Sequence, residues 1–139
     1  MLIGEYSHSV DDKGRINIPS KFRNDLGESF IITKGLDNCL FVYPYAEWKV
    51  LEERIKELPL SQSRDLQRFF FSGACEAEID KQGRVVIPLN LREYAGISKD
   101  VIINGASFRA EIWNKENYEK QSLNLTSERI VEAMDKIGF

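Results

Sequence analysis

The chain of 139 residues has few of the residue types on which metal sites and catalytic triads depend. It contains one histidine, His8, and two cysteines, Cys39 and Cys75, which lie far apart in the sequence. A zinc site needs about four nitrogen or sulfur ligands, and a catalytic triad would have to use His8. We therefore expect no metal site, no cofactor and no such enzyme, and we interpret both cysteines as ordinary buried thiols.

Long hydrophobic runs are missing as well. No apolar stretch approaches the roughly 20 residues that a membrane-spanning helix needs. The N-terminal residues contain Glu5 and His8 where a signal peptide would have a basic and then an apolar segment. A composition of 42% hydrophobic and 29% charged residues is typical of a globular chain. We expect a cytoplasmic protein without a membrane partner.

An excess of positive charge is the third missing feature. The chain carries 22 acidic residues against 19 basic ones, which gives a net charge of −3. Proteins that bind nucleic acid usually present clustered basic residues. Taken alone, the total charge therefore argues against a nucleic-acid partner.

The sequence repeats itself, and this repeat changes the interpretation of the charge. When the chain is shifted by 69 positions, seven of the twenty residues from Gly4 to Arg23 are identical to their counterparts from Gly73 to Arg92. About one identity is expected by chance. We predict two copies of a unit of roughly 50 residues, each followed by a helical segment.

Each unit contains the motif Asp-x-x-Gly-Arg, at Asp11–Arg15 and at Asp80–Arg84. Asp in the first position and Gly in the fourth are typical of a type I turn. Alternating residues then predict a short strand that ends at a proline. Helices over 20–26 and 89–95 follow, and apolar strands come next at 30–33, 39–43, 101–103 and 108–113.

Further helices are predicted between the repeats and at the C-terminus. One spans Ala46–Leu58 and stops at Pro59, and Ser61 is a candidate cap for a second that runs to Phe71. Ser127 is the candidate cap of a last helix, whose apolar face holds Ile130, Val131, Met134 and Ile137. Such faces are usually buried, so we expect these helices to cover the sheet.

The predicted organisation is a first repeat with its trailing helix at 1–60, a helical connector at 61–71, and a second repeat with the C-terminal helix at 72–139. A unit of three or four strands is marginally stable alone. We therefore expect both repeats to pack together as one compact domain.

Basic residues gather around the two motifs. The segments 13–23 and 81–92 carry seven bases and no acid, and a twofold relation between the repeats would place both on one face. A two-stranded ribbon fits the DNA major groove, where Arg binds guanine and Lys neutralises phosphate. The predicted DNA-binding residues are Lys13, Gly14, Arg15, Lys21, Arg23, Lys81, Gln82, Gly83, Arg84 and Arg92.

Asp11 and Asp80 have a different predicted role. A carboxylate near phosphate is repelled, so we expect these two side chains to hold Arg15 and Arg84 in position. The same motif also has a purely structural explanation, in which Asp caps the turn and Gly supplies the backbone angle.

Two loops make a small footprint, so useful affinity implies an oligomer that repeats them along DNA. Candidate subunit contacts are the apolar residues Leu40, Phe41, Phe69, Phe70 and Phe71. The alternative is that the three phenylalanines anchor the end of the connector helix in the core.

The chain resembles the MraZ family of bacterial transcriptional regulators, which contain two SpoVT/AbrB-type units. The residues that carry the resemblance are Gly4–Tyr6, Asp11–Pro19, Lys21–Arg23, Gly35–Asp37, Tyr43–Pro44, Trp48, Phe69–Gly73 and Asp80–Val85. The second motif departs slightly, because Gln82 stands where the first has Lys13 and the lysine comes one place earlier.

The resemblance implies a fold that is mainly β with flanking α-helices, namely a swapped-hairpin, double-split β-barrel. It also implies a ring-shaped homo-oligomer such as an octamer, associated with the nucleoid. Such a protein would bind direct repeats in double-stranded DNA upstream of the division and cell-wall gene cluster, and it would control transcription of that cluster.

Two other function classes are weighed against this one. The first is an antitoxin-like module that binds another protein without a direct role at DNA, with the acidic C-terminal helix as its binding tail. The second is an enzyme with Asp11 and Asp80 as paired carboxylates. We reject the enzyme, because a neighbouring Arg or Lys lowers a carboxyl pKa and disfavours a general acid.

Overall fold

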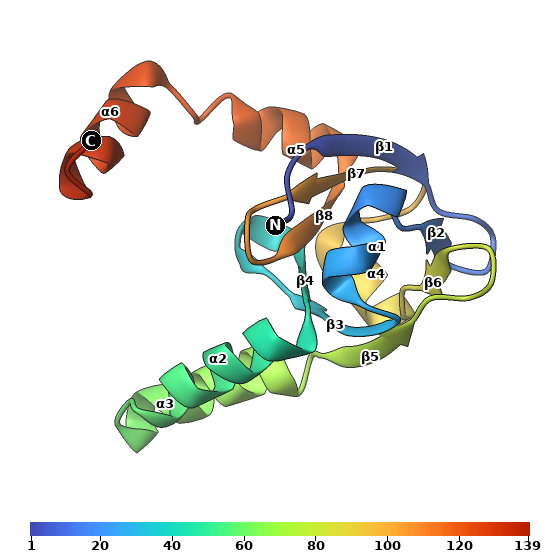
Figure 1. Cartoon of the computed structure of the whole chain (residues 1–139), viewed down its shortest axis with the longest axis horizontal. Helices are drawn as coiled ribbons and strands as arrows, with labels where there is room; N and C mark the ends of the chain where they lie inside the picture. The colour runs from blue at the N-terminus through green and yellow to red at the C-terminus, as the bar shows by residue number, and fades with distance from the viewer.

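An antiparallel sheet flanked by helices forms the body of the chain in the computed structural model, which describes residues 1–139 (Figure 1). The strands are β1 (Glu5–Ser9), β2 (Arg15–Asn17), β3 (Ser29–Lys34), β4 (Leu40–Tyr43), β5 (Cys75–Glu78), β6 (Arg84–Val86), β7 (Asp100–Gly105) and β8 (Ala110–Asn114). The helices are α1 (Ser20–Leu26), α2 (Tyr45–Lys56), α3 (Leu60–Leu66), α4 (Leu89–Ala95), α5 (Lys115–Ser122) and α6 (Ser127–Lys136). The fold is therefore mixed, with more helix than the expected mainly β class.

The strands of the two repeats are interleaved within the larger sheet. Its order is β1-β7-β8-β4-β3-β5, so that β1 of the first repeat pairs with β7 of the second, and β5 of the second pairs with β3 of the first. Because β1, β3 and β4 correspond to β5, β7 and β8, exchanging the repeats leaves this order unchanged. β1 and β5 are open edges of the sheet, so the pairing closes no barrel, and the swapped-hairpin barrel stays a prediction.

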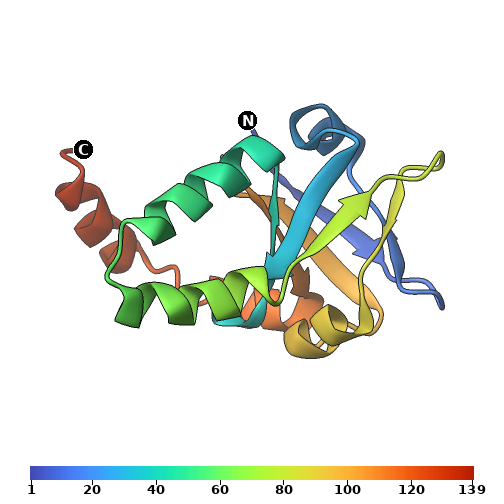
Figure 2. The ribbon, with the colours of Figure 1, turned by 90° about the horizontal axis from the view of Figure 1, so that it is seen from below.

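The strands that follow the two Asp-x-x-Gly-Arg motifs form a separate ribbon. β2 and β6 pair antiparallel, with Ile16 opposite Val85. This ribbon and its turns project from the end of the molecule opposite to helices α2 and α3 (Figures 1 and 2). The pairing thus brings together two segments that lie 69 residues apart in the sequence.

The main core lies beneath the ribbon and draws on both repeats. Ile16 and Ile18 from the first repeat and Val85 and Ile87 from the second are each at most 1% exposed and belong to one apolar cluster. Their alternation with exposed residues follows from the two-residue period of a strand. The inner face of the ribbon is therefore fixed by burial.

Most of the predicted elements are confirmed, including α1 and α4 at the predicted residues with Gly27 and Gly96 as their C-caps. Two predicted caps are wrong. Ser61 lies inside α3, which begins at Leu60, because Pro59 is the N-cap residue and its carbonyl accepts from the backbone N–H groups of Gln62 and Ser63. Thr126, one residue before Ser127, caps α6 by accepting from the backbone N–H of Arg129.

Three of the five apolar residues expected at subunit contacts are buried within the chain. Leu40, Phe41 and Phe70 are 0%, 4% and 8% exposed, respectively. Phe41 and Phe70 pack with Ile55 of α2 in a second apolar cluster, against which Phe69 and Phe71 are half-buried. The alternative expectation, that the phenylalanines anchor the connector in the core, is the one the structure supports.

The expectation that α6 covers the sheet is wrong. The helix α6 is joined to α5 by residues 123–126 and stands away from the body (Figure 1), and none of its residues is buried. The apolar face is exposed instead, with Ile130, Val131, Met134 and Ile137 at 47%, 59%, 40% and 66%. No helix of the structure has the length and apolar character needed to span a membrane.

The contrast between the core and α6 can be tested with one substitution at two positions. Ile103 is 1% exposed in β7, so Ile103→Ala is expected to lower the free energy of unfolding by about 2–5 kcal/mol. Ile130→Ala, at a position 47% exposed, is expected to change it by no more than about 0.5 kcal/mol. Urea denaturation measures both, and similar losses would mean that the α6 face is covered in solution.

Candidate nucleic-acid interface

The first motif folds into a turn that Asp11 organises with both carboxylate oxygens. Oδ1 accepts from the backbone N–H groups of Lys13 and Arg15, each at 2.9 Å. Oδ2 accepts from Nε of Arg15 at 2.7 Å. The backbone N–H of Gly14 donates to the carbonyl of Asp11 at 3.0 Å, which closes the predicted turn. One carboxylate therefore fixes the turn and the start of the Arg15 side chain together.

The second motif repeats this arrangement. Oδ1 of Asp80 accepts from the backbone N–H groups of Gln82 at 2.9 Å and Arg84 at 2.8 Å, and Oδ2 accepts from Nε of Arg84 at 3.0 Å. Gln82 occupies the place of Lys13, and in both turns only the backbone N–H of this residue contacts the Asp. The change of side chain from Lys to Gln therefore leaves the turn unchanged. In each pair the arginine side chain retains 27% exposure.

These contacts hold both carboxyl groups in the ionised form. The backbone N–H of Arg15 is the main cause that lowers the pKa of Asp11 below 3.8, and the Arg15 guanidinium adds to it against a partial desolvation. The pKa of Asp80 is lowered in the same way by the backbone N–H of Arg84. A carboxylate with a lowered pKa is a poor general acid at neutral pH.

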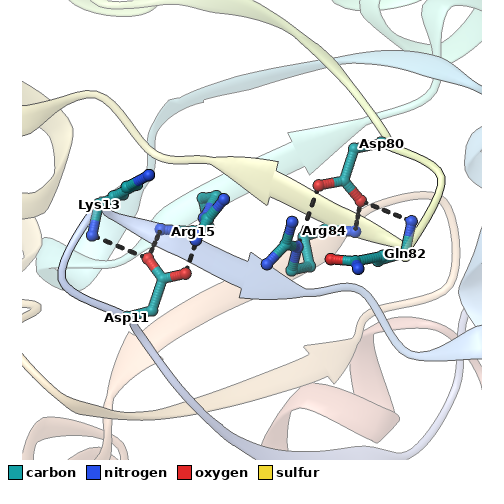
Figure 3. A network of polar contacts seen from close by, with 6 residues as sticks. All are labelled: Asp11, Lys13, Arg15, Asp80, Gln82 and Arg84. Carbon is teal, nitrogen blue, oxygen red and sulfur yellow. Dashed lines mark hydrogen bonds and ion pairs between the residues drawn. The ribbon is translucent and has the colours of Figure 1, made fainter.

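The ribbon places both arginines on one exposed face between the two turns (Figure 3). Arg15 pairs with Val86 and Arg84 pairs with Asn17 across the antiparallel register. Residues directly opposite each other, and residues two apart along a strand, share a face. All four side chains therefore point away from the core, to which Ile16 on the other face belongs.

Arg23 and Arg92 reach across to the turn of the other repeat. Arg23 donates through Nε and Nη2 to the carbonyl of Ile18, at 3.1 and 3.0 Å, and the N–H of Ile18 donates to the carbonyl of Gly83 at 2.9 Å. A Cβ atom on Gly83 would overlap Nη2 of Arg23. The Arg23 guanidinium is therefore packed directly against the backbone of Gly83.

The other half of the ribbon has the same contacts. Arg92 donates through Nε to the carbonyl of Ile87 at 2.9 Å, and Ile87 donates to the carbonyl of Gly14 at 2.8 Å. A Cβ on Gly14 would lie 2.9 Å from Cζ of Arg92. Glycine is therefore needed at both positions for two reasons. It adopts the positive φ that each turn requires, +77° at Gly14 and +79° at Gly83. It also leaves room for the arginine from the other repeat.

The remaining candidate residues lie around these contacts. Lys13, Lys81 and Gln82 are exposed at the turns, and Lys21 is exposed on α1. The sequence interpretation did not include Asn17 and Val86, although the alternation it recognised in each strand places them on the outer face with the arginines. The cross-repeat packing of Arg23 and Arg92 was also missed, because no sequence pattern specifies which turn an arginine will meet.

The residues first considered for other chemistry lie apart from this face. His8 is half-buried in β1, and burial lowers its pKa. Cys39 is buried and Cys75 half-buried, both are free thiols, and burial raises the pKa of each. No group of three or more His, Cys, Asp or Glu side chains is arranged to hold a metal ion.

Comparison with known proteins shows the family. A family model described as "MraZ protein, putative antitoxin-like" matches the chain twice, at residues 1–68 and 70–136. The chain belongs to the MraZ family. The two MraZ matches begin 69 residues apart, which is the shift at which the sequence repeats itself.

Several MraZ relatives align over their whole length with the whole of this chain. A protein of Caldicellulosiruptor bescii is 60% identical, one of Clostridium tetani is 56% identical and one of Clostridium acetobutylicum is 55% identical. Each of these relatives is named "Transcriptional regulator MraZ".

The lowered pKa values of the two motif carboxyls give a pH prediction. Since the folded-state pKa of Asp11 lies below the unfolded value, its contacts stabilise the chain above that value and are lost as the pH falls through the folded pKa. Carbon-detected NMR is expected to show Asp11 titrating below 3.8. In Arg15→Ala the midpoint should rise but stay below 3.8, because the backbone donors remain. An Asp11 midpoint at or above 3.8 in the unaltered chain would contradict these contacts.

The packing of Arg23 over Gly83 gives a second prediction. Gly96→Ala, at φ +65° with its nearest neighbour 3.8 Å away, is expected to lose about 1 kcal/mol from the backbone conformation alone. Gly83→Ala is expected to lose about 2–4 kcal/mol, because its Cβ must also displace the Arg23 guanidinium. Urea denaturation compares the two variants.

An Arg23→Ala background serves as the control for this second prediction. With the guanidinium gone, the excess loss of Gly83→Ala over Gly96→Ala should largely disappear, as in a double-mutant cycle between residues in contact. Equal losses in the unaltered background would show that Arg23 does not occupy this position in solution.

Proposed function

We propose that this chain is a DNA-binding transcriptional regulator that recognises DNA with the β2–β6 ribbon. The observation that carries the proposal is the pair of arginines, Arg15 and Arg84, which the ribbon register and their Asp partners hold on one exposed face. A two-stranded ribbon fits the major groove, and an oriented guanidinium is suited to O6 and N7 of guanine. The names of the relatives agree with this role.

The lysines supply the contacts that do not depend on sequence. Lys13 and Lys81 lie in the turns that precede β2 and β6. Because β2 and β6 are antiparallel, these turns are at opposite ends of the ribbon, where the DNA backbones would flank the groove. Each phosphate neutralised by such a lysine releases counterions, so salt should weaken binding. Lys21, Gln82 and the outer N–H groups of Arg23 and Arg92 extend this surface.

Membership of the MraZ family is the basis for proposing the assembly, the location and the DNA target of this chain. The two repeats form one domain with a swapped-hairpin arrangement, copies of the chain assemble into a ring, and the ring acts at the nucleoid in the cytoplasm. Its targets are direct repeats in the DNA upstream of the division and cell-wall gene cluster. The interleaved strand order supports the single domain, because β1 and β5 each depend on a partner from the other repeat.

A specific observation favours a second candidate, an antitoxin-like module that binds a protein. The face of α6 exposes Ile130, Val131, Met134 and Ile137, and exposed apolar patches commonly bind partners. A stoichiometric protein partner that co-purifies from native lysate, with no DNA retained at moderate salt, would favour this candidate over the regulator.

The proposed function is tested by removing the two arginines. Arg15→Ala and Arg84→Ala are each expected to weaken binding to DNA fragments selected from the genome by about 5- to 150-fold, since a bidentate base contact is worth about 1–3 kcal/mol. Fluorescence anisotropy at several salt concentrations measures the affinity, and mass measurement confirms that the assembly is unchanged.

Matched controls remove arginines at the other end of the molecule. Arg54→Ala on α2 and Arg64→Ala on α3 change the same charge away from the ribbon (Figure 2) and should leave the affinity unchanged. If both ribbon variants bind as tightly as these controls, the ribbon is not the DNA-binding site.

A further inference from the structure

Val86 is an apolar side chain in an unusual position. It is 55% exposed although it lies in a strand, and its neighbour Val85 on the same strand is 1% exposed in the core. Burial of Val85 sets the register of the strand, and strand propensity favours a branched residue at position 86 without requiring one. Arg15 lies directly opposite Val86 in the ribbon.

The equivalent position in the first repeat is Asn17, which is also exposed and lies directly opposite Arg84. The outer face of the ribbon therefore consists of two rows, Arg15 with Val86 and Asn17 with Arg84. The two rows are equivalent under exchange of the repeats, in which Arg15 corresponds to Arg84 and Asn17 to Val86. The arginine is the same in both rows, but its partner differs. These two residues are where this face departs from the symmetry of the repeat.

The dimensions of the ribbon suit base contacts. Facing residues lie about 4.5–5.5 Å apart, and the two rows are about 6.8 Å apart along the strands. Successive base pairs are separated by about 3.4 Å, so the four side chains cover about two or three base pairs. Asn17 and Val86 lie within this patch, whereas Lys13 and Lys81 lie outside it at the turns.

We propose that Asn17 and Val86 determine sequence specificity, with Val86 contacting a thymine methyl group and Asn17 hydrogen-bonding to an adenine. The proposal rests on the proposed function, because it requires that the ribbon enters the major groove. Asparagine binds N6 and N7 of adenine in bidentate fashion, and apolar side chains contact the C5 methyl group of thymine. The Arg15–Val86 row then reads guanine with thymine, and the Asn17–Arg84 row reads guanine with adenine.

A consequence is that one chain recognises an asymmetric sequence. A ribbon with identical rows would match DNA with the same twofold symmetry, that is, an inverted repeat. Because Asn17 and Val86 demand different bases, the two halves of the site differ. The orientation of the chain on DNA is thereby defined, and the two arginines alone would not define it.

The contact of Val86 is tested by removing one methyl group from the DNA. The full-length chain first selects its preferred duplex from a random library, and each thymine of that duplex is then replaced by deoxyuridine. We expect the affinity to fall about fourfold at one thymine, the effect of one buried carbon group. In Val86→Asn the same replacement should have no effect, and selection should favour adenine at that position.

Val50→Asn is the matched control, because Val50 is 50% exposed on α2, away from the ribbon. This variant should select the same duplex as the unaltered chain and keep the fourfold loss. Thermal unfolding of both variants confirms that each is folded, as expected for substitutions at exposed positions.

The contact of Asn17 has its own test. Replacing one adenine of the selected duplex by 7-deazaadenine removes N7 and should weaken binding by the unaltered chain about fivefold or more, in line with a base hydrogen bond. Asn17→Val should be insensitive to this replacement, and its two rows become alike, so it should select an inverted repeat.

The outcomes separate the two levels of the proposal. If Arg15→Ala weakens binding but no thymine responds to loss of its methyl group, or Val86→Asn shows the same response as the unaltered chain, this specificity assignment is overturned and the DNA-binding function stands. If the unaltered chain selects no duplex at all, the proposed function itself fails, and the assignment fails with it.

Discussion

The antiparallel pairing of β2 with β6 is the constraint on which the candidate interface depends. Each strand has three residues, too few to be stable alone, so each requires its counterpart from the other repeat. The hydrogen bond from Ile18 to the carbonyl of Gly83, and its equivalent from Ile87 to Gly14, tie each strand to the opposite turn. The position of each arginine on the outer face is therefore determined by both repeats, and half of the chain would not form this surface.

The pairing of β2 with β6 also determines where the charged side chains of the two motifs lie. An exposed ion pair such as Arg15 with Asp11 adds little to stability, so its significance lies in the orientation of the guanidinium. A guanidinium that donates through Nε retains its four other N–H groups as donors. The net charge of −3 is compatible with this surface, because the segments 13–23 and 81–92 have no acid. Outside these two segments the chain carries 22 acidic residues against 12 basic ones.

The sequence predicted what depends on local residues. The 69-residue shift and the Asp-x-x-Gly-Arg motif were sufficient to predict both turns, the strands after them, and α1 and α4, because turn and cap preferences act within a few residues. Arg23 was recognised as a base but not as the residue over Gly83, since no local pattern identifies its partner in the other repeat. The apolar face of α6 predicted burial, yet periodicity specifies only which residues share a face and not what covers them.

The exposed face of α6 and the small size of the ribbon both favour assembly of several copies of the chain. A ribbon with two arginines and two lysines at its turns makes few contacts with DNA, and affinity rises steeply when linked copies bind the same duplex. Copies must then associate without covering their ribbons. The ribbon lies at the end opposite to α2 and α3, and α6 also stands on the side away from it (Figures 1 and 2). Contacts made by Ile130 or Ile137 would therefore leave Arg15 and Arg84 accessible to DNA, whereas contacts through the ribbon itself would not.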